Sequence, residues 1–106
     1  MKLLNALPIT AVPKNCVIKK YELTLSHVKE IFKNEPCESF IGHSDTANIL
    51  TGMLNTPVKQ NRESAIINYD ETFIIAAYVG PRLPEGAIAL PKGASIEFYS
   101  IEVCDE

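Results

Sequence analysis

Residues 41–46 form the segment whose side chains are best suited to chemistry. Gly42 permits a tight turn, and His43 follows it, directly before an apolar pattern with helical spacing. The first turn of a helix offers free N–H groups and a positive dipole end, which together suit a phosphate. The hydroxyls of Ser44 and Thr46 would add donors, and a histidine beside a bound phosphate can give a proton to a leaving oxygen. The same residues also fit a plain helix start with an exposed histidine, so this segment alone leaves both interpretations open.

A second segment, from Gly80 to Gly86, combines Arg82 and Glu85 with glycines and prolines. Such a stretch is a stiff, exposed loop, and it follows the most apolar strand candidate of the chain. The guanidinium of Arg82 could form paired hydrogen bonds with a phosphate. A solvated turn whose charges have no functional importance is the alternative.

Residues 59–63 place Lys59 and Arg62 among two amides and a glutamate, just before a strand candidate. These side chains could touch phosphates or base edges, although such stretches are more often polar connectors.

Other kinds of site find no support in the residue types. His27 lies beside Val28 in a predicted helix and fits a surface or packing role, and no spacing of histidines, cysteines and carboxylates suggests a metal site. The glycine-rich phosphate loops of nucleotide triphosphatases and dinucleotide-binding proteins are absent, and so is the nucleophile elbow of serine hydrolases. We therefore expect neither a metal nor a cofactor.

Two helices are expected to position these residues. Thr24 can cap a helix that runs to Lys33 and repeats its apolar residues at helical spacing. Ser44 or Asp45 can cap a second helix, which ends shortly before Pro57.

The strand candidates are residues 2–7, 16–23, 63–68, 72–79 and 95–103. Residues 72–79 are almost continuously apolar, which predicts a central strand, and they are expected to form a hairpin with residues 63–68. The alternation of the last candidate slips between Phe98 and Ile101, which allows a bulge there. Residues 10–15 and 80–86 are expected to be loops, and 87–94 irregular. These elements predict one α+β domain over residues 1–106, a mixed sheet of four to five strands with helices packed on one face.

Composition narrows the possible partners. The chain has 106 residues and a net charge of -3, so a surface for long nucleic acid is not expected.

Three widely spaced cysteines fit a reducing compartment, which predicts a cytoplasmic protein. The longest apolar run, residues 73–79, is too short to cross a membrane, and the first residues read as a strand rather than a signal peptide. A chain of this size has little depth for a closed cavity, so a site shared between two subunits is plausible.

Taken in order along the chain, these segments resemble the small viral type III anti-CRISPR ring nucleases, a family with relatives in phages, mobile elements and bacterial chromosomes. The resemblance spans most of the chain and is best from residue 41 onward. It rests on an N-terminal strand ending in Asn5-Ala6, on Ile41-Gly42-His43 with Thr46, on Asn55-Thr56 and Asn61-Arg62, on Arg82-Leu83-Pro84-Glu85-Gly86, and on Ile96-Glu97-Phe98-Tyr99.

The chain departs from the family pattern in three places. Pro8 and Thr10 stand where some members carry serine and asparagine, and prolines occupy positions 81 and 84 of the loop. The connection between Leu90 and Ser95 is shorter than in other members, where it looks helical.

The resemblance implies a homodimer that binds cyclic tetra-adenylate, the second messenger of type III CRISPR systems. Such proteins cut the ring without a metal into linear di-adenylate with 2′,3′-cyclic phosphate ends, and so switch off the effector nucleases that the messenger activates. In this chain His43 matches the general acid of the family and Glu85 its catalytic glutamate. The residues expected to bind the ligand are Asn5, Thr10, Ser44, Thr46, Arg62 and Arg82.

Physical chemistry is compatible with that implication. Attack by a ribose 2′-hydroxyl on its own 3′-phosphate needs orientation, charge neutralisation and a proton for the leaving oxygen. A few arginines suffice for a compact ligand, and a two-fold symmetric ligand suits a two-fold dimer. A different class of function stays open, namely a non-catalytic sponge, sensor or small regulator that binds a cyclic nucleotide or another ligand.

Overall fold

The computed structural model describes residues 1–106 and contains five strands, two α-helices and one short 3-10 helix. In chain order these are β1 (Lys2–Leu4), η1 (Ile9–Ala11), β2 (Val17–Leu23), α1 (Leu25–Asn34), β3 (Glu38–Ser39), α2 (Ser44–Leu54), β4 (Thr72–Val79) and β5 (Ser95–Cys104).

The five strands form one mixed sheet in the order β2-β5-β4-β1-β3. Strand β5 pairs antiparallel with both β2 and β4, whereas β1 pairs parallel with both β4 and β3. The most apolar strand, β4, therefore lies in the middle, as its continuous apolar run predicted. The expected α+β domain with a mixed sheet is confirmed.

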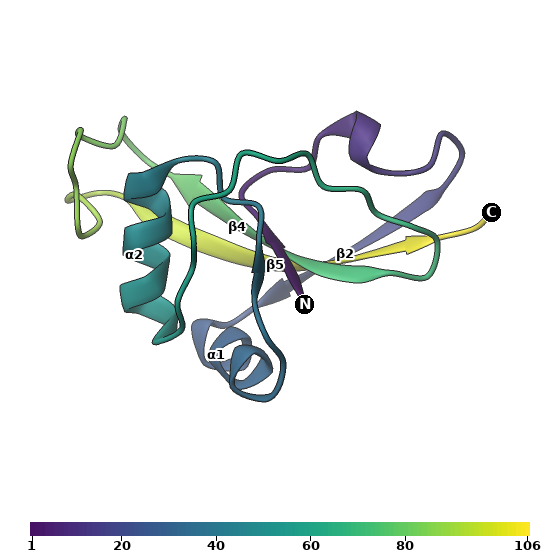
Figure 1. The fold of residues 1–106 in the computed structure, drawn as a ribbon, viewed down its shortest axis with the longest axis horizontal. Helices are drawn as coiled ribbons and strands as arrows, with labels where there is room; N and C mark the ends of the chain where they lie inside the picture. The colour runs from purple at the N-terminus through teal and green to yellow at the C-terminus, as the bar shows by residue number, and fades with distance from the viewer.

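Different segments of the chain pack on the two faces of the sheet. On one face, Leu3 and Ile74 pack with buried residues of both helices, including Val28 of α1 and Leu50 of α2. Figure 1 shows these two helices beside the sheet. On the other face, Phe73 and its neighbours are covered by chain without α-helix or strand, namely η1 and residues 64–68. Because side chains alternate along a strand, β4 supplies both cores, and the prediction of both helices on one face is confirmed.

The expected strand at residues 63–68 is wrong, although its alternation is real. Ala65 and Ile67 are buried, whereas Ile66 is 70% exposed. This segment lies across the second face of the sheet instead of joining its edge, and the Ile67 N–H donates to the Ala11 carbonyl at 2.8 Å. Burial of alternate side chains produced the strand pattern without strand pairing. The hairpin partner of β4 is consequently β5.

Three further expectations need correction, and one strand was not expected. Strand β1 ends at Leu4 rather than residue 7, because only Lys2–Leu4 finds partners in β3 and β4. The pairing of β5 with β2 and with β4 runs in unbroken register, so there is no bulge. The expected loop after β1 includes η1, and the two-residue strand β3 gave no recognisable sequence signal.

The cap of one helix was predicted correctly and the cap of the other was not. Thr24 caps α1 as expected, its hydroxyl oxygen accepting from the His27 N–H. The cap of α2 is His43, not Ser44 or Asp45, because the imidazole accepts from the Asp45 N–H and Ser44 already lies in the helix. Neither helix has the length and apolarity needed to cross a membrane.

Candidate functional site

The candidate site lies at the sheet edge where the parallel strands end. Because β1, β3 and β4 run parallel, their carboxyl ends meet at one edge, and ligands commonly bind in α/β proteins at such an edge. Asn5 follows β1, His43 follows the segment after β3, and Arg82 follows β4. Residue Gln60 also bridges in parallel to Ile41, which leads the chain to the same edge just before residue 62.

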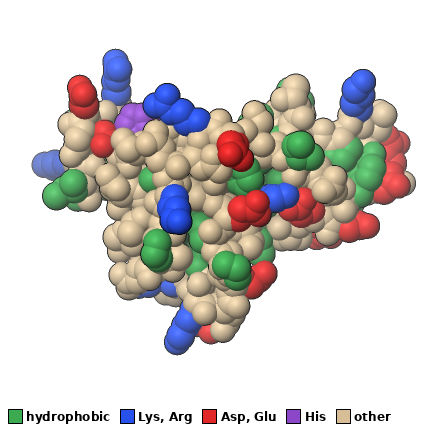
Figure 2. All heavy atoms as spheres, in the orientation of Figure 1, with side chains coloured by type: hydrophobic (Ala, Val, Ile, Leu, Met, Phe, Trp, Pro, Cys, Tyr) green, Lys and Arg blue, Asp and Glu red, His purple; other side chains and the backbone are tan.

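A groove of about 500 Å³ at this edge brings together three predicted residues. Its lining consists of His43, at the start of α2, and Arg82, Leu83, Pro84 and Glu85, from the loop after β4. Figure 2 shows a histidine with basic and acidic side chains close by, at the end of the molecule where α2 begins. Two segments separated by almost forty residues of chain thus place an imidazole, a guanidinium and a carboxylate on one surface.

The backbone cap of α2 orients the His43 ring. Its Nδ1 accepts from the Asp45 N–H at 3.2 Å, so in the neutral ring the hydrogen belongs on Nε2. No protein group bonds to Nε2, and the ring is exposed. The cap therefore fixes one nitrogen and leaves the other for a ligand in the groove.

The loop after β4 presents Glu85 at the corner of a tight turn. The Ala87 N–H donates to the Pro84 carbonyl at 3.2 Å, and Gly86 has a φ of 76°. A positive φ at the third of four residues is what a type II turn requires, and glycine provides it without strain. Glu85 is the second residue of this turn, so its side chain projects from the corner.

Two contacts fasten this loop at its two ends. Near Arg82, the Tyr78 hydroxyl donates to the Pro81 carbonyl. Near Glu85, the Gly86 N–H donates to Oδ2 of Asp45 at 2.8 Å. The loop is therefore tied both to its own strand and to the first turn of α2.

Arg62 lies against the turn that precedes His43. Its Nε donates to the Gly42 carbonyl at 3.2 Å, and the Gln60 amide donates to the same oxygen at 3.0 Å. The Arg62 side chain is exposed, and its terminal nitrogens make no bond within the protein. Arg62 is thus next to the groove without lining it.

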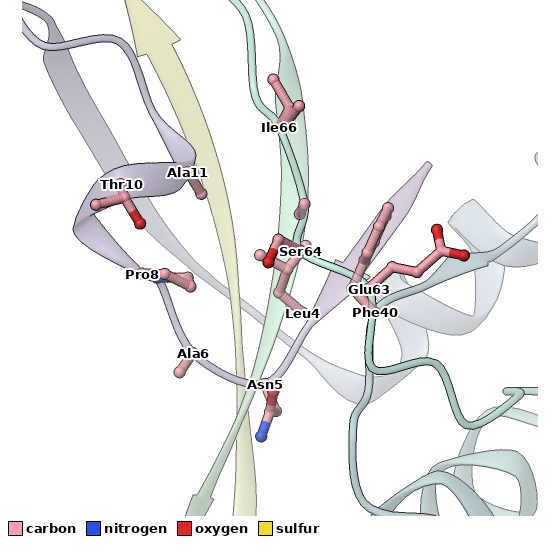
Figure 3. A pocket seen from close by; sticks show the side chains of 11 residues that line it. Leu4, Asn5, Ala6, Pro8, Thr10, Ala11, Phe40, Glu63, Ser64 and Ile66 are labelled. Carbon is pink, nitrogen blue, oxygen red and sulfur yellow. The ribbon is translucent and has the colours of Figure 1, made fainter.

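The other predicted ligand residues lie outside the groove. Ser44 is exposed and Thr46 half-buried in the first turn of α2. Asn5 and Thr10 line a separate pocket of about 290 Å³, together with Phe40 and Glu63 among others. Figure 3 shows that its polar side chains do not converge: the Asn5 amide and the Glu63 carboxylate point in different directions, away from Thr10.

Two residues near the site have roles that the sequence pattern did not reveal. Asp45 was expected at most to cap α2, but it is buried and binds the loop. Asn61 acts as a structural clamp, since its amide donates to the Ser39 carbonyl at 3.0 Å and its oxygen accepts from the Glu63 N–H at 3.0 Å. The polar spacing of residues 59–63 was the one available signal for that clamp.

The structure contains no group of three or more histidine, cysteine or acidic side chains arranged to hold a metal ion.

Comparison with known proteins assigns the chain to a family. The model of the STIV B116-like family, named after a protein of Sulfolobus turreted icosahedral virus, matches residues 1–98. The chain belongs to this family.

Individual relatives agree with that assignment. Uncharacterized protein 26 of Sulfolobus islandicus filamentous virus (isolate Iceland/Hveragerdi) is 31% identical over 87 residues, which cover 81% of this chain and 73% of the relative. The structure of B116 of Sulfolobus turreted icosahedral virus superposes with a TM-score of 0.78, covering 95% of this chain and 97% of B116. B116 is 22% identical, a level at which the likeness shows the shared fold. Both relatives are proteins of archaeal viruses.

Proposed function

We propose that this STIV B116-like protein is a ring nuclease that binds cyclic tetra-adenylate and cleaves it without a metal into linear di-adenylate with 2′,3′-cyclic phosphate ends. The observation that carries the proposal is the groove of His43, Arg82 and Glu85. It offers a proton donor, a cation for a phosphate and a carboxylate on one surface. Relatives in archaeal viruses fit a role in the host cytoplasm, where destroying the messenger would silence type III CRISPR signalling.

The proposed reaction is an in-line displacement at phosphorus. Glu85, the only carboxylate that lines the groove, takes the proton of a ribose 2′-hydroxyl. The 2′-oxygen bonds to the adjacent phosphorus, the bond from phosphorus to the 5′-oxygen breaks, and His43 delivers a proton to that oxygen. Arg82 and Arg62 neutralise the charge that builds on the phosphate.

His43 would use its free Nε2 for this proton. Full transfer takes the imidazolium form, in which Nδ1 also carries a hydrogen and gives up its contact with the Asp45 N–H. The cap contact therefore orients the ring in the free protein, before the proton is transferred.

Other predicted residues would hold the remainder of the ligand. Asn5 and Thr10 line a separate pocket that follows β1, and they would contact a nucleoside that extends beyond the groove. Ser44 and Thr46 offer hydroxyls at the positive end of α2.

A homodimer is part of the proposal. Only five residues of one chain line the groove, so we propose that a second copy is needed to enclose a ring of four nucleotides. Val79, at the end of β4, is 45% exposed, and Ile88, in the segment between β4 and β5, is 84% exposed. These side chains give a partner subunit apolar surface to cover. Each subunit would then present one His43 and one Glu85 to the two halves of the ring.

The proposal is tested by incubating excess pure protein with labelled cyclic tetra-adenylate in EDTA and following the label over time. Loss of the ring, which stays intact in a parallel incubation without protein, is the expected result. A ring that binds but stays whole would support the alternative of a non-catalytic sponge or sensor. A ring that neither binds nor reacts would contradict both the ring nuclease and the non-catalytic binder.

A further inference from the structure

Asp45 is a buried carboxylate that joins two distant parts of the site. It lies in the first turn of α2, and only 9% of its surface is exposed. Its Oδ2 accepts the Gly86 N–H at 2.8 Å, across 41 positions of the chain. The other hydrogen bonds of residues 81–94 connect the loop to itself or to Tyr78 at its base. The Asp45–Gly86 contact is therefore the one hydrogen bond that ties this loop to a distant element.

The same residue also holds the ring on the other side of the groove. The Asp45 backbone N–H donates to Nδ1 of His43. The carboxylate of Asp45 holds Gly86, whose neighbour in the chain is Glu85. One residue thus contacts the two polypeptide segments that carry the proton donor and the carboxylate of the groove.

A carboxylate is chemically suited to this place. The first turn of a helix favours negative charge because its N–H dipoles point outward. A bond from a backbone N–H to a charged oxygen is among the stronger hydrogen bonds in proteins. A buried polar side chain costs free energy unless it is hydrogen-bonded, and the Gly86 N–H supplies that bond here.

We propose that Asp45 is a positioning residue, which sets the place of Glu85 relative to His43 by latching the loop to α2; this inference rests on the proposed ring nuclease function. Arg82 is fastened separately, through the Tyr78–Pro81 contact. Loss of the latch therefore slows cleavage more than it weakens binding, because displacement of a reacting group by about 1 Å can cost on the order of 100-fold in rate.

The test begins with the wild-type protein and needs no ligand. Amide hydrogen exchange by NMR should show the Gly86 N–H protected relative to the Gly93 N–H, which donates no hydrogen bond. Equal exchange of the two amides, after correction for neighbouring residues, would overturn the latch even if the protein cleaves the ring. This measurement also covers the case in which a variant at position 45 fails to fold.

Three variants then test the consequence for catalysis. Asp45→Ala removes the acceptor, Asp45→Asn keeps an acceptor oxygen of the same shape, and Asn48→Ala is a control on the exposed side of α2. In single turnovers, Asp45→Ala should cleave about 10- to 100-fold more slowly, with affinity for the ring changed less than about threefold. Asp45→Asn should recover most of the rate, and Asn48→Ala should match wild type.

The outcomes separate the latch from the proposed function. An Asp45→Ala variant that cleaves as fast as wild type would contradict the positioning role, and so would equal losses in Asp45→Ala and Asp45→Asn. A wild-type protein that does not cleave the ring would refute the proposed function, while protection of Gly86 would still support the latch itself.

Discussion

At the scale of single residues, His43 has two roles that a substitution can separate. It caps α2 through Nδ1, and it faces the groove with Nε2 free. Asparagine is a good helix cap but cannot transfer a proton. We predict that His43→Asn lowers the single-turnover cleavage rate by about 100-fold or more, while the affinity for the ring and the free energy of unfolding stay close to wild type.

The matched control is His27→Asn, since His27 lies exposed on α1 away from the groove. An unchanged cleavage rate in His43→Asn would remove His43 from the chemistry.

Arg82 belongs to binding rather than to proton transfer. Its side chain is exposed and lines the groove without a partner in the protein. A hydrogen bond between charged groups contributes about 1.5–3 kcal/mol, so Arg82→Ala should weaken ring binding by roughly 10- to 100-fold. Titration calorimetry at moderate salt measures this, with Lys92→Ala as a control that removes an equal charge outside the groove. Equal affinities of the two variants would show that the loop does not face the ligand.

The sequence predicted much of the site at this scale, but not all of it. Residue type singled out His43 and Arg82, because few other side chains suit a phosphate, and the family resemblance added Glu85. The structure brings all three to one groove. The contact of Asp45 with Gly86 was not predicted, because it spans 41 positions and depends on the fold. Asn5 and Thr10 were expected in the same site, yet they line a separate pocket.

At the scale of elements, local patterns were reliable for helices and for the long strands. Apolar spacing and the Thr24 cap predicted α1, and the apolar run predicted β4. Residues 63–68 show the limit of the method, since alternating burial arises equally in a segment laid across a sheet. Periodicity reports which side chains are buried, whereas strand pairing also needs a backbone partner that no local pattern reveals.

The base of the β4–β5 hairpin depends on Gly80. Its φ is 139°, and a Cβ placed there would lie 2.7 Å from the Cα of Ala94. Gly80→Ala should therefore destabilise the protein by about 1–3 kcal/mol in urea unfolding. The matched substitution Gly52→Ala, in α2 with no atom within 4 Å of the added carbon, should stabilise it by about 0.5–1 kcal/mol. Changes of the same sign in both variants would contradict this account of the hairpin.

An ion pair helps to link β1 to the segment that covers the second face of the sheet. Lys2 donates to the Ile66 carbonyl at 2.8 Å and lies 2.7 Å from Oε2 of Glu71. Partial burial raises the pKa of the Glu71 carboxyl, but hydrogen bonds from Lys2 and the Asn68 N–H, together with nearby positive charge, outweigh it and hold the pKa below its ordinary value.

This lowered pKa gives the ion pair a pH dependence of known sign. Because the folded pKa lies below the unfolded one, the stabilisation is present above the unfolded pKa of about 4.3 and is lost as the pH falls through the folded pKa. Glu71→Gln should thus be less stable than wild type by up to about 1 kcal/mol at neutral pH, and this gap should narrow as the pH falls below the unfolded pKa of about 4.3. Urea unfolding at neutral and at acidic pH measures the gap, and a gap of constant size would contradict the assignment.

At the scale of the whole molecule, the proposal requires two copies around one ring. We predict a homodimer in sedimentation at micromolar concentration, one ring bound per two chains in calorimetry, and a melting temperature that rises with ring concentration. The exposed Ile88, beside the groove loop, is a suitable place to disturb such an interface, and Ile88→Asp should favour the monomer. A monomeric mass together with one-to-one binding would refute both the dimer and the shared site.

The central claim is that the groove of His43, Arg82 and Glu85 cleaves a cyclic tetra-adenylate. The most direct test is mass spectrometry of the products after incubation of the ring with pure protein in EDTA. The account predicts linear di-adenylate ending in a 2′,3′-cyclic phosphate and a 5′-hydroxyl, formed by wild type and not by His43→Asn. Recovery of the intact ring, or cleavage that appears only after a divalent metal is added, would contradict it.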